Sequence, residues 1–186
     1  MNNLIITGAP GSGKGTQATL LANRLGIPHI STGDIFREEM RLQTPLGIAI
    51  TDSMNAGQYT SDTITNAVIE KRLGQPDVSN GFILDGYPRT VNQVEFLDSI
   101  QLRVDRVLDL DIDVEDAVQR LLLRAKESGR KDDANEDVIR GRMNIYRETV
   151  LPVLDIYAER GLVKTFAATG KIADINQSLY EAIVSL

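Results

Sequence analysis

A glycine-rich loop near the N-terminus limits the folds open to this chain more than any other feature. It runs from Gly8 to Thr16, and the spacing of glycine, four residues, glycine and Lys14 is typical of a phosphate-binding loop. A β-prone run over residues 4–7 precedes it, and a helical apolar pattern over residues 18–25 follows it. Backbone N–H groups can approach phosphate oxygens closely only where side chains are absent. The unit therefore predicts a strand, a phosphate-binding turn and a helix whose N-terminus adds positive potential.

The residue after the loop lysine departs from the usual motif. Most phosphate loops have Ser or Thr there to ligate magnesium, whereas this chain has Gly15, with Thr16 one residue later. We therefore expect no metal site made by protein atoms alone, with Mg²⁺ held mainly by substrate phosphates and water. Asp85, at the end of a β-prone run, is the candidate acceptor for a magnesium-bound water, and a turn-forming role is the alternative.

The balance of charged residues excludes several classes of function. The 186 residues include 20 Lys and Arg against 26 Asp and Glu, a formal net charge of −6, which repels nucleic acids and anionic membranes. There is no Cys and one His, His29, which excludes disulfides, thiol catalysis and zinc sites built from Cys or several His. We interpret His29 as structural. No apolar run approaches roughly 18 residues, and no signal-peptide pattern is present, so we expect a cytoplasmic protein without membrane or nucleic-acid partners.

Strand-like and helical patterns alternate along the rest of the chain. Further strands are expected at residues 27–30, 82–84, 104–112 and 162–166. Helices are expected from a cap at Thr32 or Asp34, over 47–54, from a cap at Ser61 or Asp62 through 73, over 94–100, from 114 to 125, over 138–157 with a kink or interruption at Pro152, and over 172–183. Residues 128–135 are polar and predict an exposed loop. This alternation predicts an α/β fold whose central parallel sheet is flanked by helices on both faces.

Four motifs together resemble the adenylate kinase family. They are GAPGSGKGTQ at residues 8–17, STGDIFR at 31–37, DGYPRT at 85–90 and GRKDD at 129–133, and they occur in that family's order. The resemblance covers essentially the whole chain and implies the three-layer P-loop fold with two small mobile segments. The implied division is core over 1–30, 61–124 and 136–186, a segment that binds the nucleoside monophosphate over 31–60, and a short lid over 125–135. Long lids of this family often hold zinc with Cys residues, so no zinc is expected here.

The resemblance also implies which residues hold each nucleotide. ATP is assigned to Gly11, Ser12, Gly13, Lys14, Gly15, Thr16, Arg124 and Gly170. AMP is assigned to Thr32, Arg37, Gln58, Tyr59, Thr60, Gly86, Tyr87, Pro88, Arg89, Gln93, Arg130 and Arg142. Tyr87 and Pro88 are expected to shape the turn rather than take part in chemistry. Many relatives have Lys-Leu-Val where this chain has Gln58, Tyr59 and Thr60.

The implied chemistry depends on cations rather than on a general base. A phosphate acceptor is already mostly anionic at pH 7, because its second pKa is about 6. Catalysis then requires positioning and charge compensation, and the planar fork of arginine suits both. The resemblance implies that Lys14, Arg89, Arg124, Arg130 and Arg142 are catalytic. Three roles stay open: Arg120 acts in the site or only in structure, and Asp132 and Asp133 either pair with lid arginines or are solvated loop acids.

The implied activity is reversible, magnesium-dependent phosphoryl transfer from ATP to AMP, giving two ADP, by a monomer that serves adenylate energy-charge homeostasis and purine nucleotide salvage. Thr32 and the Gln93 amide favour AMP as the acceptor, because similar pyrimidine kinases usually have Ala in place of this Thr. A UMP/CMP kinase is the alternative within the class. A non-catalytic nucleotide-sensing module is the alternative outside it, although Arg89 and the lid arginines argue against a sensor.

Overall fold

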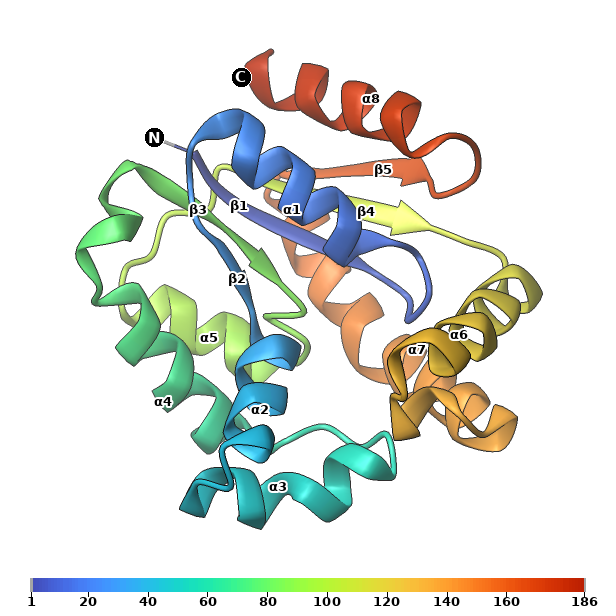
Figure 1. The fold of residues 1–186 in the computed structure, drawn as a ribbon. Helices are drawn as coiled ribbons and strands as arrows, with labels where there is room; N and C mark the ends of the chain where they lie inside the picture. Colours follow the sequence, from blue (N-terminus) through green and yellow to red (C-terminus); the bar gives the residue numbers. More distant parts are fainter. Residues whose placement is uncertain (1, 186) are drawn as a thin grey trace.

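The computed structural model describes residues 2–185 and has a five-stranded, all-parallel sheet at its centre (Figure 1). The strands are β1 (Asn2–Gly8), β2 (His29–Ser31), β3 (Gly81–Asp85), β4 (Arg106–Asp111) and β5 (Val163–Ala167), in the order β2-β3-β1-β4-β5. Every neighbouring pair is parallel, so each connection must cross over a face of the sheet. The expected α/β fold with a flanked parallel sheet is therefore confirmed.

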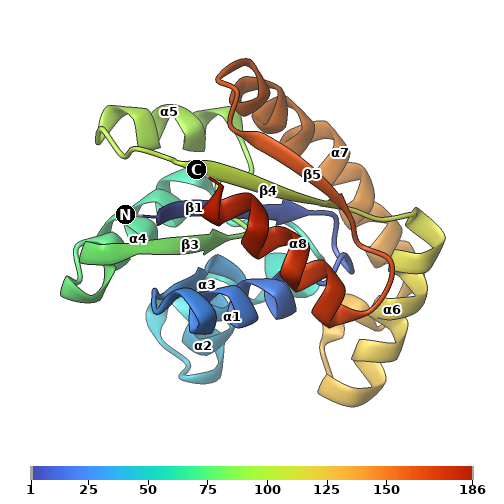
Figure 2. The ribbon, with the colours of Figure 1, turned by 90° about the horizontal axis from the view of Figure 1, so that it is seen from above.

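Side chains alternate between two apolar cores because the period of a strand is two residues. From β1, Leu4 and Ile6 face a core shared with α1 (Lys14–Leu25) and α8 (Ile172–Val184). Ile5 faces a second core shared with α4 (Asp62–Leu73), α5 (Val91–Ser99) and α7 (Glu136–Glu159). Figure 2 shows α1 and α8 on one face of the sheet and α5 and α7 on the other. The result is three layers, with both faces of the sheet covered.

The carboxyl ends of the central strands meet at one edge of the sheet. β1 lies between β3 and β4, with Ile6 beside Asp85 and Gly8 beside Leu110. The chain leaves β1 toward one side and returns as β4 on the other, which is the switch point where open α/β sheets bind ligands. The phosphate loop follows β1 at this edge, and Asp85 ends β3 there.

Two smaller units stand beyond this edge. The helices α2 (Thr32–Arg41) and α3 (Pro45–Asn55) form one, and the end of α6 (Val114–Ser128), the short 3₁₀ helix η2 (Lys131–Asp133) and the start of α7 form the other (Figure 1). A third apolar cluster, with Leu121 from α6 and Ile139 and Met143 from α7, holds the second unit together. The fold thus brackets the end of β1 with two helical units.

The structure corrects several local expectations. Ser31 caps α2, with its hydroxyl accepting from Asp34 N, in place of Thr32 or Asp34. The helix α7 runs unbroken through Pro152 instead of being interrupted there. The helix α6 continues to Ser128, so the segment expected as the lid begins inside a helix. Of the two caps expected for α4, Ser61 or Asp62, the structure shows Ser61, whereas the 3₁₀ helix η1 (Pro76–Asn80) was not expected from the sequence.

No helix within residues 2–185 is both long and apolar enough to cross a membrane.

Candidate active site

The phosphate loop passes from β1 to α1 with little room for side chains. Gly8 and Gly11 have φ angles of 144° and 87°. A Cβ atom on Gly8 would lie 2.6 Å from the carbonyl oxygen of Leu110, and one on Gly11 would lie 2.7 Å from that of Ala117. Both positions therefore need glycine for backbone conformation and for space. The helix α1 begins at Lys14 directly behind the loop, so its N-terminal N–H groups face the cavity in front of it.

Lys14 lies at the centre of a cationic cavity. Its ammonium donates to the Ala9 carbonyl oxygen at 3.4 Å. Burial lowers the pKa of Lys14 to about 8; the charge of Asp85 opposes this shift, and the positive charges of Arg89, Arg142 and Arg124 add to it. The folded protein therefore holds this ammonium in a site that lacks sufficient negative charge, which a bound polyphosphate would supply.

Asp85 lies at the floor of the same cavity and is buried. Its Oδ2 atom is 3.1 Å from His29 Nε2, and the other imidazole nitrogen, Nδ1, is 3.3 Å from the Thr19 hydroxyl. A Cβ atom on Gly15 would stand 3.5 Å from the same Asp85 oxygen. His29, which we interpreted from the sequence as structural, thus lines the cavity and contacts its carboxylate. The contact with Asp85 could not be foreseen, because Asp85 is 56 residues away from His29 along the chain.

The cavity in front of the loop has a volume of about 360 Å³ and gathers cations from four parts of the chain. Its lining includes all five residues expected to be catalytic, namely Lys14, Arg89, Arg124, Arg130 and Arg142, together with Arg37. Asp34 and Asp85 are the carboxylates in that lining. A protein of net charge −6 thus concentrates positive charge at one place, which is the pattern expected of a site for several phosphate groups.

Asp133 connects two of these arginines. The carboxylate is fully buried and accepts from Arg124 Nε and Arg142 Nη1, each at 2.6 Å. Asp132 adds a 2.9 Å ion pair with Arg142. Burial alone would raise the pKa of Asp133, but the two guanidinium groups outweigh it and hold that pKa below the usual carboxyl range. The polar run expected to be an exposed loop therefore contains a buried anion, and both acids pair with arginines of the site.

Arg37 and Arg130 meet at the opposite side of the cavity. Arg37 donates to Asp34 at 2.6 Å, and Arg130 lies 3.9 Å from the same carboxylate oxygen. Burial and the positive charges of Arg37 and Arg124 lower the pKa of Arg130. One carboxylate thus serves two guanidinium groups, which leaves donors on both available to a phosphate.

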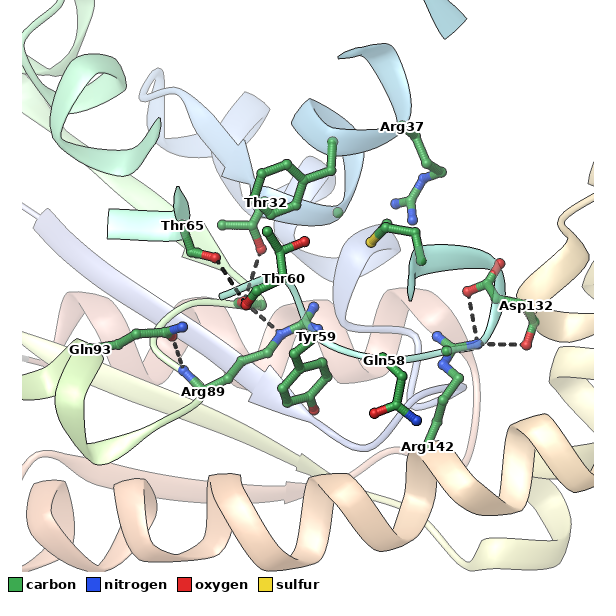
Figure 3. A pocket seen from close by; sticks show the side chains of 15 residues that line it. Thr32, Arg37, Gln58, Tyr59, Thr60, Thr65, Arg89, Gln93, Asp132 and Arg142 are labelled. Atoms are coloured by element: carbon green, nitrogen blue, oxygen red, sulfur yellow. Dashed lines mark hydrogen bonds and ion pairs between the residues drawn. The ribbon is translucent and has the colours of Figure 1, made fainter. Parts of the chain in front are cut away.

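A second pocket opens between the α2–α3 unit and the turn that follows β3 (Figure 3). Among the residues assigned to the acceptor nucleotide, it is lined by Thr32, Arg37, Gln58, Tyr59, Thr60, Gly86, Arg89, Gln93 and Arg142. Phe36, Met54 and Thr65 also line it and were not expected from the sequence. Phe36 and Met54 are apolar residues of amphipathic helices, and the sequence pattern alone does not separate such residues from ordinary core.

Some polar groups of this pocket already have hydrogen-bond partners within the protein, and others do not. The Thr32 hydroxyl donates to the Gly86 carbonyl oxygen at 2.9 Å. Both ends of the Gln93 amide are engaged: Oε1 accepts from Arg89 N at 2.6 Å and Nε2 donates to Asp62 at 2.7 Å. The Thr60 hydroxyl is buried and has no hydrogen-bond partner within residues 2–185. A base in this pocket could therefore pair with Thr60 Oγ1, whereas the Gln93 amide nitrogen is already engaged.

Three residues assigned to AMP are not among the residues that line this pocket: Arg130, which lines the cationic cavity instead, and Tyr87 and Pro88. Tyr87 is 1% exposed and packs in the second core, where its hydroxyl donates to Asn66 at 2.7 Å. Pro88 lines a small cavity behind the phosphate loop. Tyr87 therefore supports the turn after β3 from behind, because its ring and hydroxyl both have partners in the core.

A third pocket, of about 300 Å³, lies on the other side of the phosphate loop. It is lined by Gly11, Ser12, Gly13, Thr16, Arg124 and Gly170 from the residues assigned to ATP, and by Gln17, Leu121 and Ile172 among others. The Ser12 hydroxyl is buried without a partner in the described part of the chain. Arg120 also lines this pocket and donates to the Ala168 carbonyl oxygen at 3.0 Å. Arg120 thus fixes the backbone before Gly170.

A buried amide pair anchors the loop at this third pocket. Gln17 Nε2 donates to the Ile172 carbonyl oxygen at 3.0 Å, and Asn176 donates to Gln17 Oε1 at 3.0 Å. Gln17 is the last residue of the first motif, yet no role was expected for it. The contact could not be read from the sequence, because Gln17 and Asn176 are 159 residues apart.

Taken together, the parallel sheet, the phosphate loop and the two pockets joined by a cationic cavity define a P-loop nucleotide-binding protein. Residues 6–162 match the family model described as Adenylate kinase. The chain is similar to the adenylate kinase of Pseudarthrobacter chlorophenolicus, with 46% identity over 98% of this chain and 97% of the relative. It is also similar to those of Nocardioides sp. (45%, covering 97% and 96%) and Kocuria rhizophila (46%, covering 98% and 99%). The chain therefore belongs to the adenylate kinase family.

Proposed function

We propose that this protein catalyses reversible transfer of the terminal phosphoryl group of ATP to AMP, giving two ADP. The observation that carries the proposal is the cavity of Lys14 and five arginines, which lies between two pockets of different character. The pocket beside Gly170 would take the base of ATP, and the pocket beside Thr32 that of AMP. The phosphates of both nucleotides would then meet in front of the glycine loop.

The residues of the cavity supply positioning and charge compensation. The backbone N–H groups at the start of α1 and the Lys14 ammonium would hold the outer phosphates of ATP. Arg89, Arg37 and Arg142 would hold the phosphate of AMP, and Arg124 and Arg130 would neutralise charge on the group in transfer. No side chain needs to remove a proton, because the attacking phosphate oxygen is already an anion at pH 7.

Magnesium fits this site as a partner of ATP rather than as a resident metal. Within residues 2–185 no three His, Cys, Asp or Glu side chains form a group that could hold a metal ion. Asp85 is a buried carboxylate at the floor of the cavity, and Mg²⁺ is commonly bound through one or two carboxylates with water and substrate phosphates. Asp85 would accept hydrogen bonds from magnesium-bound water, and the ion would compensate charge between the outer phosphates of ATP.

AMP is the proposed acceptor, and the groups that would select its base are Thr32 and Thr60 rather than Thr32 and Gln93. Because the Gln93 amide is engaged by Asp62 and Arg89, Thr60 becomes the group with a free hydroxyl for the base, beside Thr32. Leaving such a buried group unpaired costs about 1–3 kcal/mol, so a base that pairs with it is favoured. We further propose that the enzyme is a monomer, because the cavity and both pockets are complete within one chain, and that it acts in the cytoplasm.

A coupled assay with ATP-Mg and a panel of AMP, CMP, UMP and GMP tests this proposal. We expect kcat/KM for AMP to exceed that for each other monophosphate, and Thr60→Val to lower it by roughly 5- to 150-fold. Equal or better use of CMP or UMP would assign the protein to the pyrimidine kinases. Binding of nucleotides without turnover of any monophosphate would assign it to the sensors.

A further inference from the structure

Arg89 is the arginine of the cavity whose charge no acid of the described chain balances. Arg124 and Arg142 pair with Asp133, and Arg37 and Arg130 with Asp34. Among residues 2–185, no carboxylate forms an ion pair with Arg89. A carboxylate there would compete with a phosphate for the same donors, so its absence leaves the guanidinium free to bind the acceptor.

The backbone holds only one corner of this guanidinium. Arg89 Nε donates to the Gly86 carbonyl oxygen at 2.7 Å, and the backbone N–H of Arg89 donates to Gln93 at 2.6 Å. Neither terminal nitrogen, Nη1 or Nη2, has a hydrogen-bond acceptor within the described residues. One hydrogen bond to Nε restrains the position of the group, but the plane of the fork can still turn about that bond.

The ring of Tyr59 supplies the missing restraint. The guanidinium carbon of Arg89 lies 4.5 Å from the centre of this ring, within the range of a cation–π contact. Tyr59 comes from the loop between α3 and α4, and Figure 3 shows its ring beside the Arg89 guanidinium. A ring that contacts the guanidinium from one side leaves its terminal N–H groups available to a ligand on another side.

We propose that Tyr59 is a positioning residue that acts through Arg89, fixing the plane of its guanidinium for bidentate binding of the acceptor phosphate. This inference rests on the proposed function of the pocket. Tyr59 thus replaces the restraint that a carboxylate would give, without competing for the phosphate.

The test compares three variants by their steady-state kinetics. Tyr59→Leu removes the ring but keeps an apolar side chain at a half-buried loop position, so it is expected to fold. It should lower kcat/KM for AMP by roughly 2- to 30-fold while leaving KM for ATP unchanged. Tyr59→Phe keeps the ring and should recover most of that loss. Tyr180→Leu removes a matched stack, with Arg24 3.4 Å from the Tyr180 ring, on the helices α1 and α8 away from the acceptor pocket. It should lower Tm and leave kcat/KM for AMP unchanged.

A double-mutant cycle with Arg89→Lys separates action through Arg89 from a general effect on the pocket. Because Lys has no planar fork to orient, Tyr59→Leu should cost little in the Arg89→Lys background. An equal cost in both backgrounds, or no cost of Tyr59→Leu in the parent enzyme, would overturn the inference. The parent enzyme is assayed first, and if it does not phosphorylate AMP, the proposed function fails. If the parent is active but Tyr59→Leu does not change kcat/KM for AMP, only the positioning role of Tyr59 is overturned.

Discussion

The lowered pKa of Lys14 predicts how activity depends on pH. Its pKa of about 8, lowered by burial and by the neighbouring arginines, means that the free enzyme loses this positive charge just above neutrality. Bound phosphates should raise that pKa again, because they favour the charged form. We therefore expect kcat/KM for ATP to fall above about pH 8, and kcat to hold to higher pH, since the two parameters report the free and bound enzyme respectively.

Two substitutions make this dependence specific to Lys14. Arginine does not deprotonate in this range, so the activity that remains in Lys14→Arg should lack the alkaline fall in kcat/KM. Lys14→Ala should lower turnover by at least about 100-fold while the fold stays intact, because a preorganised cation is lost where charge develops. A parent profile that is flat to pH 10, or one that Lys14→Arg leaves unaltered, would contradict the assignment.

The same lowered pKa predicts how Lys14 affects stability. In the unfolded chain this group binds its proton up to a pKa near 10.5, but in the folded protein only up to about 8. Between these values the unfolded state holds more protons, so the contribution of Lys14 to the free energy of unfolding rises with pH. Chemical denaturation of the parent and Lys14→Ala measures that contribution: the parent should gain stability relative to the variant between pH 7 and pH 10. A stability difference that stays constant over this range would show that the site does not perturb the lysine.

Asp133 is a residue on which both stability and the placement of two arginines depend. Asp133→Asn leaves Arg124 and Arg142 without their buried anion, and we expect a loss of about 1–3 kcal/mol. This is less than for a fully buried pair, because Arg124 is 37% exposed and therefore screened. Asp98→Asn is the matched control, because Asp98 also accepts two hydrogen bonds from guanidinium nitrogens, both from Arg160 and both on the surface. It should cost less than about 1 kcal/mol.

The pH dependence of that loss follows from the lowered pKa of Asp133. A carboxyl whose pKa is lower in the folded state contributes stability above the ordinary carboxyl pKa of about 4, and this contribution disappears as the pH falls through the folded pKa. The parent and Asp133→Asn should therefore differ in Tm at pH 7 and converge toward pH 2. A constant difference over that range would show that the carboxylate charge is not what stabilises the lid.

At the scale of elements, the contact between α2 and α3 shapes the acceptor side. A Cβ atom on Gly47 would lie 2.0 Å from the backbone oxygen of Glu39, where the two helices cross. Gly47→Ala must therefore push the helices apart, and we expect a loss of about 1–3 kcal/mol in the free energy of unfolding and a higher KM for AMP, because α2 carries Thr32 and Arg37.

Gly141 offers the matched control for that substitution. It lies inside α7, and a Cβ atom there would meet nothing within 4 Å. Gly141→Ala should stabilise the protein by about 0.5–1 kcal/mol and leave KM for AMP unchanged. The idea that α2 and α3 act as one packed unit would be wrong if Gly47→Ala behaved like Gly141→Ala in thermal denaturation and in AMP kinetics.

The order and type of the elements could be predicted from the sequence, because apolar periodicity and glycine punctuation are local signals. Their exact ends were less certain: Ser31, Thr32 and Asp34 can all cap a helix, and only the extended backbone at Ser31 shows which one does. Pro152 was expected to kink or interrupt α7, yet the helix runs through it without interruption, where Val150, Val153 and Tyr157 are buried. The local helix propensity of Pro152 was therefore outweighed by the burial of its neighbours against the sheet.

The members of the site could be predicted from motifs, but not their partners. The cations expected around the phosphate loop all line one cavity. The sequence could not show that Asp62 engages the Gln93 amide, that Asp85 meets His29, or that Asp133 is buried between two arginines. Each of these contacts joins separate elements, and the sequence around a polar residue does not indicate which distant residue it will contact.

For the molecule as a whole, the expected division into a core and two mobile segments remains a prediction. Its metal requirement can be tested directly. After dialysis, elemental analysis should find no stoichiometric zinc, and a chelator should stop activity that added Mg²⁺ restores. Zinc that stays bound in stoichiometric amount, with activity lost on its removal, would contradict the view that magnesium enters only with ATP.

The central claim is that the cavity of Lys14 and five arginines moves a phosphoryl group from ATP onto AMP. The most direct test measures ADP and inorganic phosphate together while the parent enzyme consumes ATP-Mg and AMP. We predict two ADP formed for each AMP consumed, essentially no inorganic phosphate, and the loss of both ADP products in Lys14→Ala. Release of one phosphate per ATP, or ADP formation that does not depend on AMP, would show that the site hydrolyses ATP and would contradict the claim.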